Sequence, residues 1–237
     1  MKGTNGLPVA LIGLIFLWAP VAPAQSQKQA APTVPMPQSG VPQVFSMEGR
    51  FVRAAYNNEG YVIMGYQPAN RSVGEEWMLL EVGVTVRDKV PSFTMKRDAL
   101  SVETPDGTTI PLATIQEFRA ANTQALQQRA KVQRDSIDYF PPGVSRACRM
   151  GFFSDLADPA VPWDQFDVTS DRGCIGRLYF HVPGGIKYGQ HWLNVKFPNS
   201  LVRAPFRILT AEEEKTFSKN YKSISKQVKE AFKPPKK

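Results

Sequence analysis

The sequence predicts a mainly β protein: a β-sandwich that carries a helical insertion and ends in an amphipathic C-terminal helix. Apolar and polar residues alternate through most of residues 44–209, which is the period of half-buried strands. About eight short strands are separated by turn signals, a pattern typical of two packed sheets. Helical patterns occur at residues 115–134 and 210–237, which gives the insertion and the terminal helix.

The composition is that of a globular domain. The 237 residues are 42% hydrophobic and 21% charged, with a formal net charge of +8. Two cysteines and two histidines are too few for a disulfide-rich scaffold, a four-thiolate zinc site or a His-rich metal centre. The sequence contains no Walker loop, no G-x-S-x-G elbow and no H-E-x-x-H motif. We therefore expect no catalytic residues, no cofactor and no metal.

The N-terminal segment has the parts of a secretory signal at residues 1–24. Lys2 supplies a positive charge, residues 9–18 are apolar, and residues 22–24 (APA) match a cleavage signal. We expect a periplasmic or secreted protein with no transmembrane segment after cleavage. An uncleaved membrane anchor is the alternative, although the apolar run is short for a ~20-residue crossing. Residues 25–43 follow as a Pro- and Gln-rich linker that cannot bury a core.

The clearest strand is WMLLEVGVTVR at residues 77–87. Its even-numbered residues are all apolar and its odd-numbered ones are mixed, so we expect one buried face and one partly exposed face. The turn Pro105-Asp106-Gly107 predicts a hairpin between residues 99–103 and 108–112. Other strands are expected at residues 45–55, 61–66, 176–182, 191–197 and 206–209.

Three segments carry a resemblance to a known class of domains. These are YVIMGYQPANRSVGEEWMLLEVGVTVRD (61–88), TMKRDALSVETPDGTTIPL (94–112) and GRLYFHVP (176–183). Together they resemble bacterial immunoglobulin-like extracytoplasmic domains of unknown function. The resemblance implies an immunoglobulin-like β-sandwich, and it implies no common catalytic residues. The chain departs from this class by its long insertion.

The insertion begins with IQEFRAANTQALQQRAKVQR, residues 115–134, which has helical composition and contains neither Gly nor Pro. Such a helix covers a sheet edge or an end of the sandwich, or it faces a partner. Residues 139–175 follow as a long loop that contains Trp163, Phe166 and other aromatics, so we expect the loop to pack. Five acids lie in it without a Lys or Arg between Gly151 and Asp171: Asp155, Asp158, Asp164, Asp167 and Asp171. A solvated acidic face, a contact with the basic tail or a basic partner, and a calcium site remain open.

Cys148 and Cys174 bracket this loop, and they permit only one intramolecular pairing. In an oxidising compartment we expect them to form a structural disulfide. Closing a loop of about 27 residues would contribute roughly 3–4 kcal/mol. His181 and His191 fall on different sides of their predicted strands, so they are poor co-ligands, and we expect both at the surface or rim.

The C-terminal residues 210–237 predict a basic amphipathic helix. Thr210 is a good N-cap for the acidic first turn at residues 212–214, and Pro234-Pro235 stop the helix. One apolar stripe recurs at spacings of three or four: Phe217, Tyr221, Ile224, Val228 and Phe232. Lysines cover the other faces, among them Lys222, Lys226 and Lys229. The stripe docks on its own domain or binds a protein, or the helix lies on an anionic surface.

We expect an exported, non-enzymatic interaction or accessory module of the bacterial cell envelope, with a protein partner there. Its candidate contact residues are Trp163, Phe166 and the stripe and lysines of the terminal helix. An anionic surface is a second possible partner through the basic tail, but no specific nucleic acid is expected. The alternatives are a small-ligand or carbohydrate-binding protein, with Trp163 and Trp192 as a stacking platform, and a hydrolase with a carboxylate pair among the loop aspartates.

Overall fold

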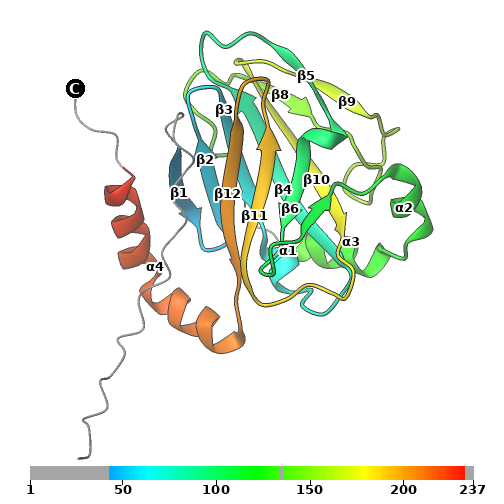
Figure 1. Ribbon diagram of the computed structural model, residues 1–237, viewed down its shortest axis with the longest axis vertical. Coiled ribbons are helices and arrows are strands. Elements are labelled where there is room, and N and C mark those ends of the chain that lie inside the picture. Colours follow the sequence, from blue (N-terminus) through cyan, green and yellow to red (C-terminus); the bar gives the residue numbers. More distant parts are fainter. Residues whose placement is uncertain (1–42, 134–135, 233–237) are drawn as a thin grey trace, which may run out of the picture. The chain divides into compact units, whose positions relative to one another are not determined.

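The computed structural model describes residues 43–133 and 136–232 (Figure 1). The predicted signal at residues 1–24, the linker up to residue 42 and the last five residues lie outside this description. The described chain is mainly β and ends in a long helix, as predicted. Two sheets form a sandwich, and a separate two-stranded ribbon accompanies them.

The first sheet has the order β1-β2-β3-β4-β10-β8 and is antiparallel except for the parallel pair β10–β8. Its strands are β1 (Val44–Gly49), β2 (Val52–Tyr56), β3 (Gly60–Gly65), β4 (Trp77–Val86), β10 (Arg172–His181) and β8 (Arg146–Arg149). The single strand expected at residues 45–55 is therefore two strands, because the chain turns at Arg50 and Phe51.

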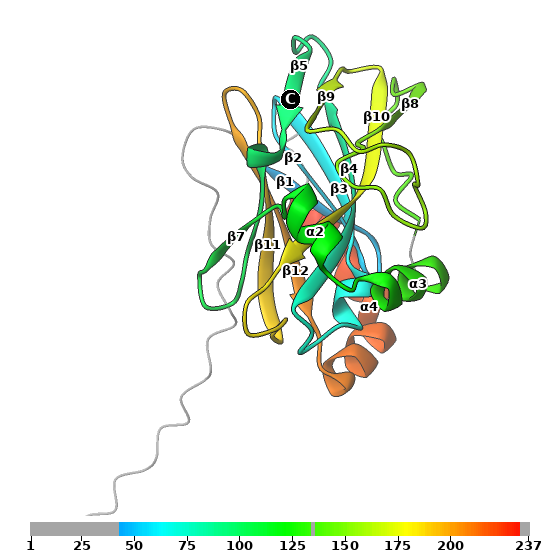
Figure 2. The same cartoon turned by 90° about the vertical axis from the view of Figure 1, so that its right-hand side faces the viewer.

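The second sheet has the order β12-β11-β6-β7 and faces the first (Figure 2). Its strands are β12 (Leu201–Ile208), β11 (Gly189–Lys196), β6 (Leu100–Glu103) and β7 (Thr109–Pro111). β6 and β7 pair around the predicted Pro105-Asp106-Gly107 turn, where Gly107 has φ +81°. β5 (Phe93–Lys96) and β9 (Gln165–Val168) form the ribbon. β5, β8 and β9 were not expected from the sequence, and β8 and β9 lie inside the segment predicted to be a loop.

The core lies between the two sheets. The even-numbered residues of β4 face it, as predicted, and Leu80 stands opposite Leu178 of β10. The odd-numbered face of β4 is also buried, contrary to the expectation of a half-exposed strand. The insertion covers this outer face of the first sheet: Tyr179 of β10 contacts the rings of Phe118 and Phe153 at centroid distances of 4.6 and 5.1 Å.

The helical insertion is divided in two. α2 (Ile115–Ala120) begins at a capping box between Thr114 and Glu117, and α3 (Gln124–Val132) follows after a short break. The break contains Asn122 and Thr123, residue types whose side chains compete for backbone hydrogen bonds and favour helix ends. Two short helical turns, α1 (Gln67–Asn70) and η1 (Arg97–Ala99), complete the structure.

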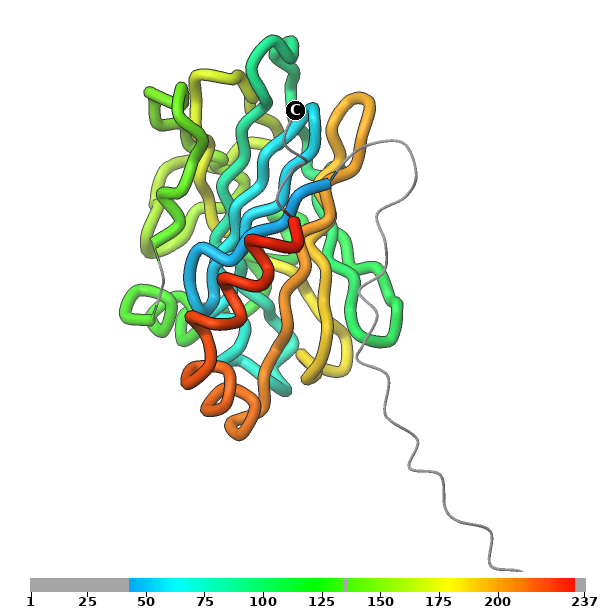
Figure 3. The backbone as a smooth tube through the Cα atoms, turned by 90° about the vertical axis from the view of Figure 1, so that its left-hand side faces the viewer, coloured from blue at the N-terminus to red at the C-terminus, as the bar shows by residue number. Residues whose placement is uncertain are grey.

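The terminal helix α4 (Ala211–Ala231) begins where the sequence predicts. The Thr210 side chain accepts a hydrogen bond from the backbone N–H of Glu213, and the Glu213 carboxylate accepts one from the N–H of Thr210. α4 lies across β1, the edge strand of the first sheet (Figure 3). The edge strand is thereby covered by the chain's own helix.

Candidate functional site

The apolar stripe of α4 faces its own domain, as the first of the three alternatives for this helix expects. All five stripe residues are half-buried, whereas Lys222, Lys226 and Lys229 are exposed. The Tyr221 hydroxyl and the Ser225 hydroxyl both donate to the carbonyl of Met47 in β1, at 3.3 and 3.2 Å. Phe232 packs edge-on against Phe45 with 5.7 Å between ring centroids.

Ion pairs hold the first turn of α4 against the domain. The two guanidinium nitrogens of Arg71 donate to the two oxygens of Glu214 at 2.6 and 2.5 Å, a bidentate pair. Arg207 of β12 donates to Glu213 at 2.6 Å and lowers the pKa of that carboxyl. Two of the three acids that open the helix are therefore engaged by arginines of the domain.

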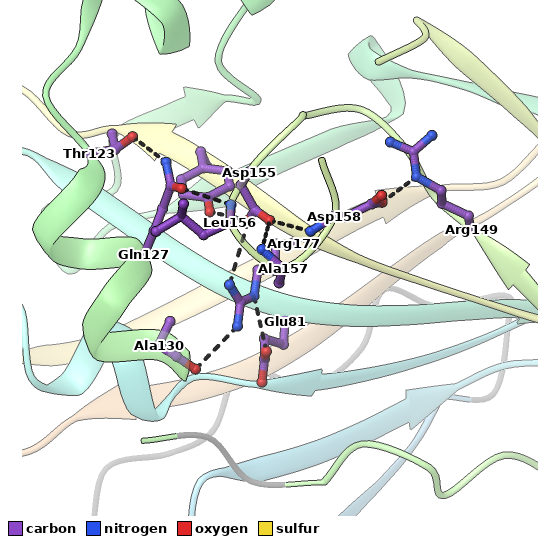
Figure 4. Close-up of polar contacts among 11 residues, drawn as sticks. Glu81, Thr123, Gln127, Ala130, Arg149, Asp155, Leu156, Ala157, Asp158 and Arg177 are labelled. Carbon is purple, nitrogen blue, oxygen red and sulfur yellow. Dashed lines mark hydrogen bonds and ion pairs between the residues drawn. The ribbon is translucent and has the colours of Figure 1, made fainter. Parts of the chain in front are cut away.

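A cavity of about 430 Å³ lies over the outer face of the first sheet, between β4, β10 and the loop segments of the insertion. Its polar surroundings are drawn in Figure 4. The lining residues come from two strands and two loop segments: Glu81 of β4; Ile175, Gly176 and Arg177 of β10; loop residues 136–138; and loop residues 151–153, 155, 157 and 158. A cavity of this size is within the usual range for small-ligand sites.

The floor of the cavity is a buried ion-pair network. Arg177 and Glu81 stand opposite each other in the register of β10 and β4, and Arg177 Nε is 3.2 Å from Glu81 Oε1. Arg177 Nη2 donates to the carbonyl of Ala130 in α3 at 3.2 Å. Arg177 Nη1 lies 3.6 Å from Asp155 Oδ2 and has no hydrogen-bond partner among the described residues. Arg177 therefore ties the sheet, the helix and the loop together.

Asp155 organises the loop above this floor. Its Oδ1 accepts from the backbone N–H groups of Ala157 and Asp158 at 2.8 and 2.9 Å, and its Oδ2 accepts from the Tyr179 hydroxyl. Burial and the neighbouring carboxylate raise the pKa of Tyr179 far above its usual value, so the phenol stays protonated and donates. Gln127 of α3 accepts from the N–H of Leu156 at 3.0 Å, which fixes the helix to the same loop.

The insertion carries most of the exposed apolar side chains of the described residues. Five of the seven large apolar residues that are exposed in the described chain belong to the insertion: Val132, Tyr139, Leu156, Val161 and Trp163, which we call the insertion face. The Arg149 side chain organises the later part of this face. It pairs with Asp158, donates to the carbonyls of Ala160 and Val161 at 3.1 Å, and stacks over the Trp163 ring at 4.7 Å.

Two aromatic predictions need correction. Phe166, expected as a contact residue, is only 6% exposed, because its position on β9 turns it inward against Phe152. The proposed platform of Trp163 and Trp192 does not form, since Trp192 lies on β11 of the second sheet with Arg203 over its ring at 4.7 Å. The loop does pack through Phe152 and Phe153, which are buried in the core.

The five loop acids are dispersed rather than gathered. Asp155 and Asp158 line the cavity, whereas Asp164 pairs with Arg97 at 2.8 Å. Asp167 and Asp171 lie toward the other end of the loop and accept from Thr94 and Thr169 at 2.7 and 2.6 Å. Across residues 43–133 and 136–232, no three His, Cys, Asp or Glu side chains are grouped as a metal would require.

Cys148 and Cys174 form the predicted disulfide. They stand opposite each other in the parallel pair β8–β10, so the bond fastens the edge strand to the sheet and closes the loop that lines the cavity. The Arg177 ion-pair network on β10 and the Cys148–Cys174 disulfide therefore hold the same loop in place.

His181 lies on the first sheet and His191 on the second, and the burial of His191 is contrary to expectation. His181 of β10 is 42% exposed and lies 3.7 Å from Glu76. His191 of β11 is fully buried rather than at the rim, stacked on Phe206 at 5.2 Å between ring centroids. Burial lowers the pKa of His191 to about 4, so its ring is neutral at physiological pH.

Comparison of the chain with models of protein families, with curated proteins and with solved structures found no match. Within the part of the chain that the structure describes, none of the helices combines the length and apolar character needed to cross a membrane.

Proposed function

We propose that this protein is an exported, non-enzymatic interaction module of the bacterial cell envelope, and that its insertion face contacts a protein partner. The observation that carries the proposal is that the insertion holds five of the seven large apolar side chains exposed in the described residues. Val161 and Trp163 are 80% and 45% exposed, although large apolar side chains gain free energy from leaving water. Such concentrations on a protein surface mark interaction sites.

The insertion face is held in place by the contacts beneath it. Gln127 binds α3 to the loop, Arg177 binds α3 to the sheet, and Cys148–Cys174 closes the loop on β10. A surface fixed before it meets its partner loses less conformational entropy on binding. This favours a recognition role for the insertion over a role in core coverage alone.

Export and the immunoglobulin-like class are part of the same proposal. The signal-like residues 1–24 support export, and a structural disulfide is compatible with an oxidising compartment. The two-sheet sandwich is compatible with the resemblance to immunoglobulin-like extracytoplasmic domains. N-terminal sequencing of the protein recovered from the envelope fraction tests export, with Gln25 as the expected first residue.

A matched pair of charge substitutions tests the proposed contact face. Leu156 on the insertion face and Leu201 on β12 are exposed to nearly the same extent, 39% and 40%. Leu156→Glu should abolish co-purification of envelope partners, whereas Leu201→Glu should leave it unchanged. Equal co-purification by both variants, each shown to fold by circular dichroism, would contradict the proposal.

Binding of a small polar ligand or a carbohydrate in the cavity is the second candidate function. It is favoured by Arg177 Nη1, a buried donor in the cavity wall whose hydrogen bond a ligand oxygen would complete. Ala157 lines the cavity but is itself exposed, so Ala157→Trp should obstruct the cavity without disturbing the core. Ligands from a sugar panel that stabilise the wild-type protein but not this variant would support the candidate. A hydrolase has less support, because the two aspartates at the cavity are engaged as a turn cap and in an ion pair.

A further inference from the structure

The docking of α4 leaves one face of the helix directed away from the domain. Five exposed lysines occupy it, the lysine row: Lys215, Lys219, Lys222, Lys226 and Lys229. With 3.6 residues per turn, the row lies roughly 140° around the helix from the apolar stripe and is about 21 Å long. Because the stripe packs on β1, the exposed lysines of the row lie on the side of the helix away from the domain.

The domain also removes much of the negative charge that would offset these lysines. Glu213 and Glu214 are engaged by Arg207 and Arg71. The exposed acids of the helix are Glu212 and Glu230, one at either end of the row. None of the five lysines forms an ion pair with an acid among the described residues, so the row presents a continuous positive potential.

We infer that the lysine row docks the protein on the surface of a bilayer that contains anionic phospholipid. The apolar stripe is already occupied by β1, so α4 cannot offer it to the hydrophobic groove of a protein partner. Phe217 and Tyr221 face the domain and are not presented for stacking on nucleic-acid bases. A straight, outward row of ammonium groups fits a planar anionic surface, and it binds there without inserting apolar side chains.

This mode of binding should be electrostatic and therefore sensitive to salt. Each lysine near an anionic bilayer strengthens binding by about fivefold. Raising the salt concentration from about 0.15 M to about 1 M shortens the Debye length from about 8 to about 3 Å and should release the protein. The surface is distinct from the insertion face, so bilayer binding and partner binding can be lost separately.

The test is vesicle co-sedimentation of the protein in the form that its host exports. Wild-type protein should bind vesicles that contain phosphatidylglycerol, release in high salt, and ignore phosphatidylcholine vesicles. Lys222→Gln/Lys226→Gln should weaken binding by roughly 25-fold. Lys131→Gln/Lys196→Gln removes the same charge from exposed positions outside α4 and should change binding by less than about threefold. All variants keep the same N-terminal residues, so this comparison isolates the row.

Three results would overturn the inference: no binding to anionic vesicles, equal weakening by the two double variants, or binding to double-stranded DNA that is tighter than binding to vesicles. Retention of bilayer binding by Leu156→Glu would separate this surface from the insertion face.

Discussion

Arg177 and Glu81 form an ion pair across the neighbouring strands β10 and β4 of the first sheet, with 3.2 Å between Nε and Oε1, and each side chain is only 8% exposed. The pair lies on the face of the sheet that a two-sheet sandwich would leave to solvent. It is buried because α3 and the loop after it fold over this face and bring Ala130 and Asp155 to the same guanidinium. The insertion is thus joined to the sandwich through charged groups as well as apolar ones.

Loss of this guanidinium should destabilise the protein severely. Arg177→Met leaves the buried carboxylates of Glu81 and Asp155 without their shared cation, which should lower the free energy of unfolding by roughly 3–5 kcal/mol. The double variant Glu81→Leu/Arg177→Met should lose less, because it removes the Glu81 carboxylate together with the guanidinium that pairs with it. Urea denaturation measures both values. A loss of less than about 1 kcal/mol for the single variant would show that the network contributes little.

Acid should destabilise the protein through His191. Its pKa is about 4 in the folded protein against the ordinary 6.5, so between these values the unfolded chain binds the proton more readily. The free energy of unfolding should therefore fall by roughly 3 kcal/mol as the pH drops from 6.5 to 4. His191→Gln should remove this component from the pH profile of stability, and His181→Gln at the exposed position should retain it. Identical pH profiles for wild type and His191→Gln would refute the assignment.

Loss of the disulfide should weaken the loop that supports the insertion face. Cys148→Ser/Cys174→Ser opens a loop between residues 26 apart, which should cost roughly 3–4 kcal/mol by the chain-entropy argument. Thermal melting with and without reductant gives the same comparison in the wild-type protein. Two free thiols per molecule in the native exported protein would contradict the bond.

The start of α4 depends on its capping box. Thr210→Ala removes the acceptor for the Glu213 N–H and should lower the free energy of unfolding by about 1 kcal/mol. Thr216→Ala is the matched control, because Thr216 is exposed inside the same helix and alanine has the higher helix propensity. The control should be neutral or slightly stabilising by chemical denaturation. Equal destabilisation by both substitutions would remove the argument for the cap.

Local patterns were sufficient to predict the parts of the fold that depend on neighbouring residues. The period-two alternation located β4 and its core face, and Thr210 as N-cap of an acidic first turn located the start of α4. The disulfide followed from there being only one possible pair. In each case the signal lies within a few residues or in a simple count.

Features that depend on distant contacts could not be predicted in the same way. The odd-numbered face of β4 was expected to be partly exposed, because nothing near Glu81 in the sequence indicates that Arg177 and α3 cover this face. The break between α2 and α3 was missed because the segment lacks Gly and Pro. The Phe166 side chain faces inward because β9 pairs with β5, a pairing that the sequence did not predict. A helical stripe likewise predicts that α4 is amphipathic, but not that β1 covers it.

The most direct test of the central claim is photo-crosslinking in the living host from single positions on two surfaces. A photoreactive residue at Val161, which is 80% exposed on the insertion face, should give one defined adduct with an envelope protein, and Leu156→Glu in the same chain should abolish it. The same residue at Leu201 on β12 should give no adduct. An adduct from Leu201 and none from Val161, with both proteins exported at equal levels, would contradict the assignment of the insertion face as the contact surface.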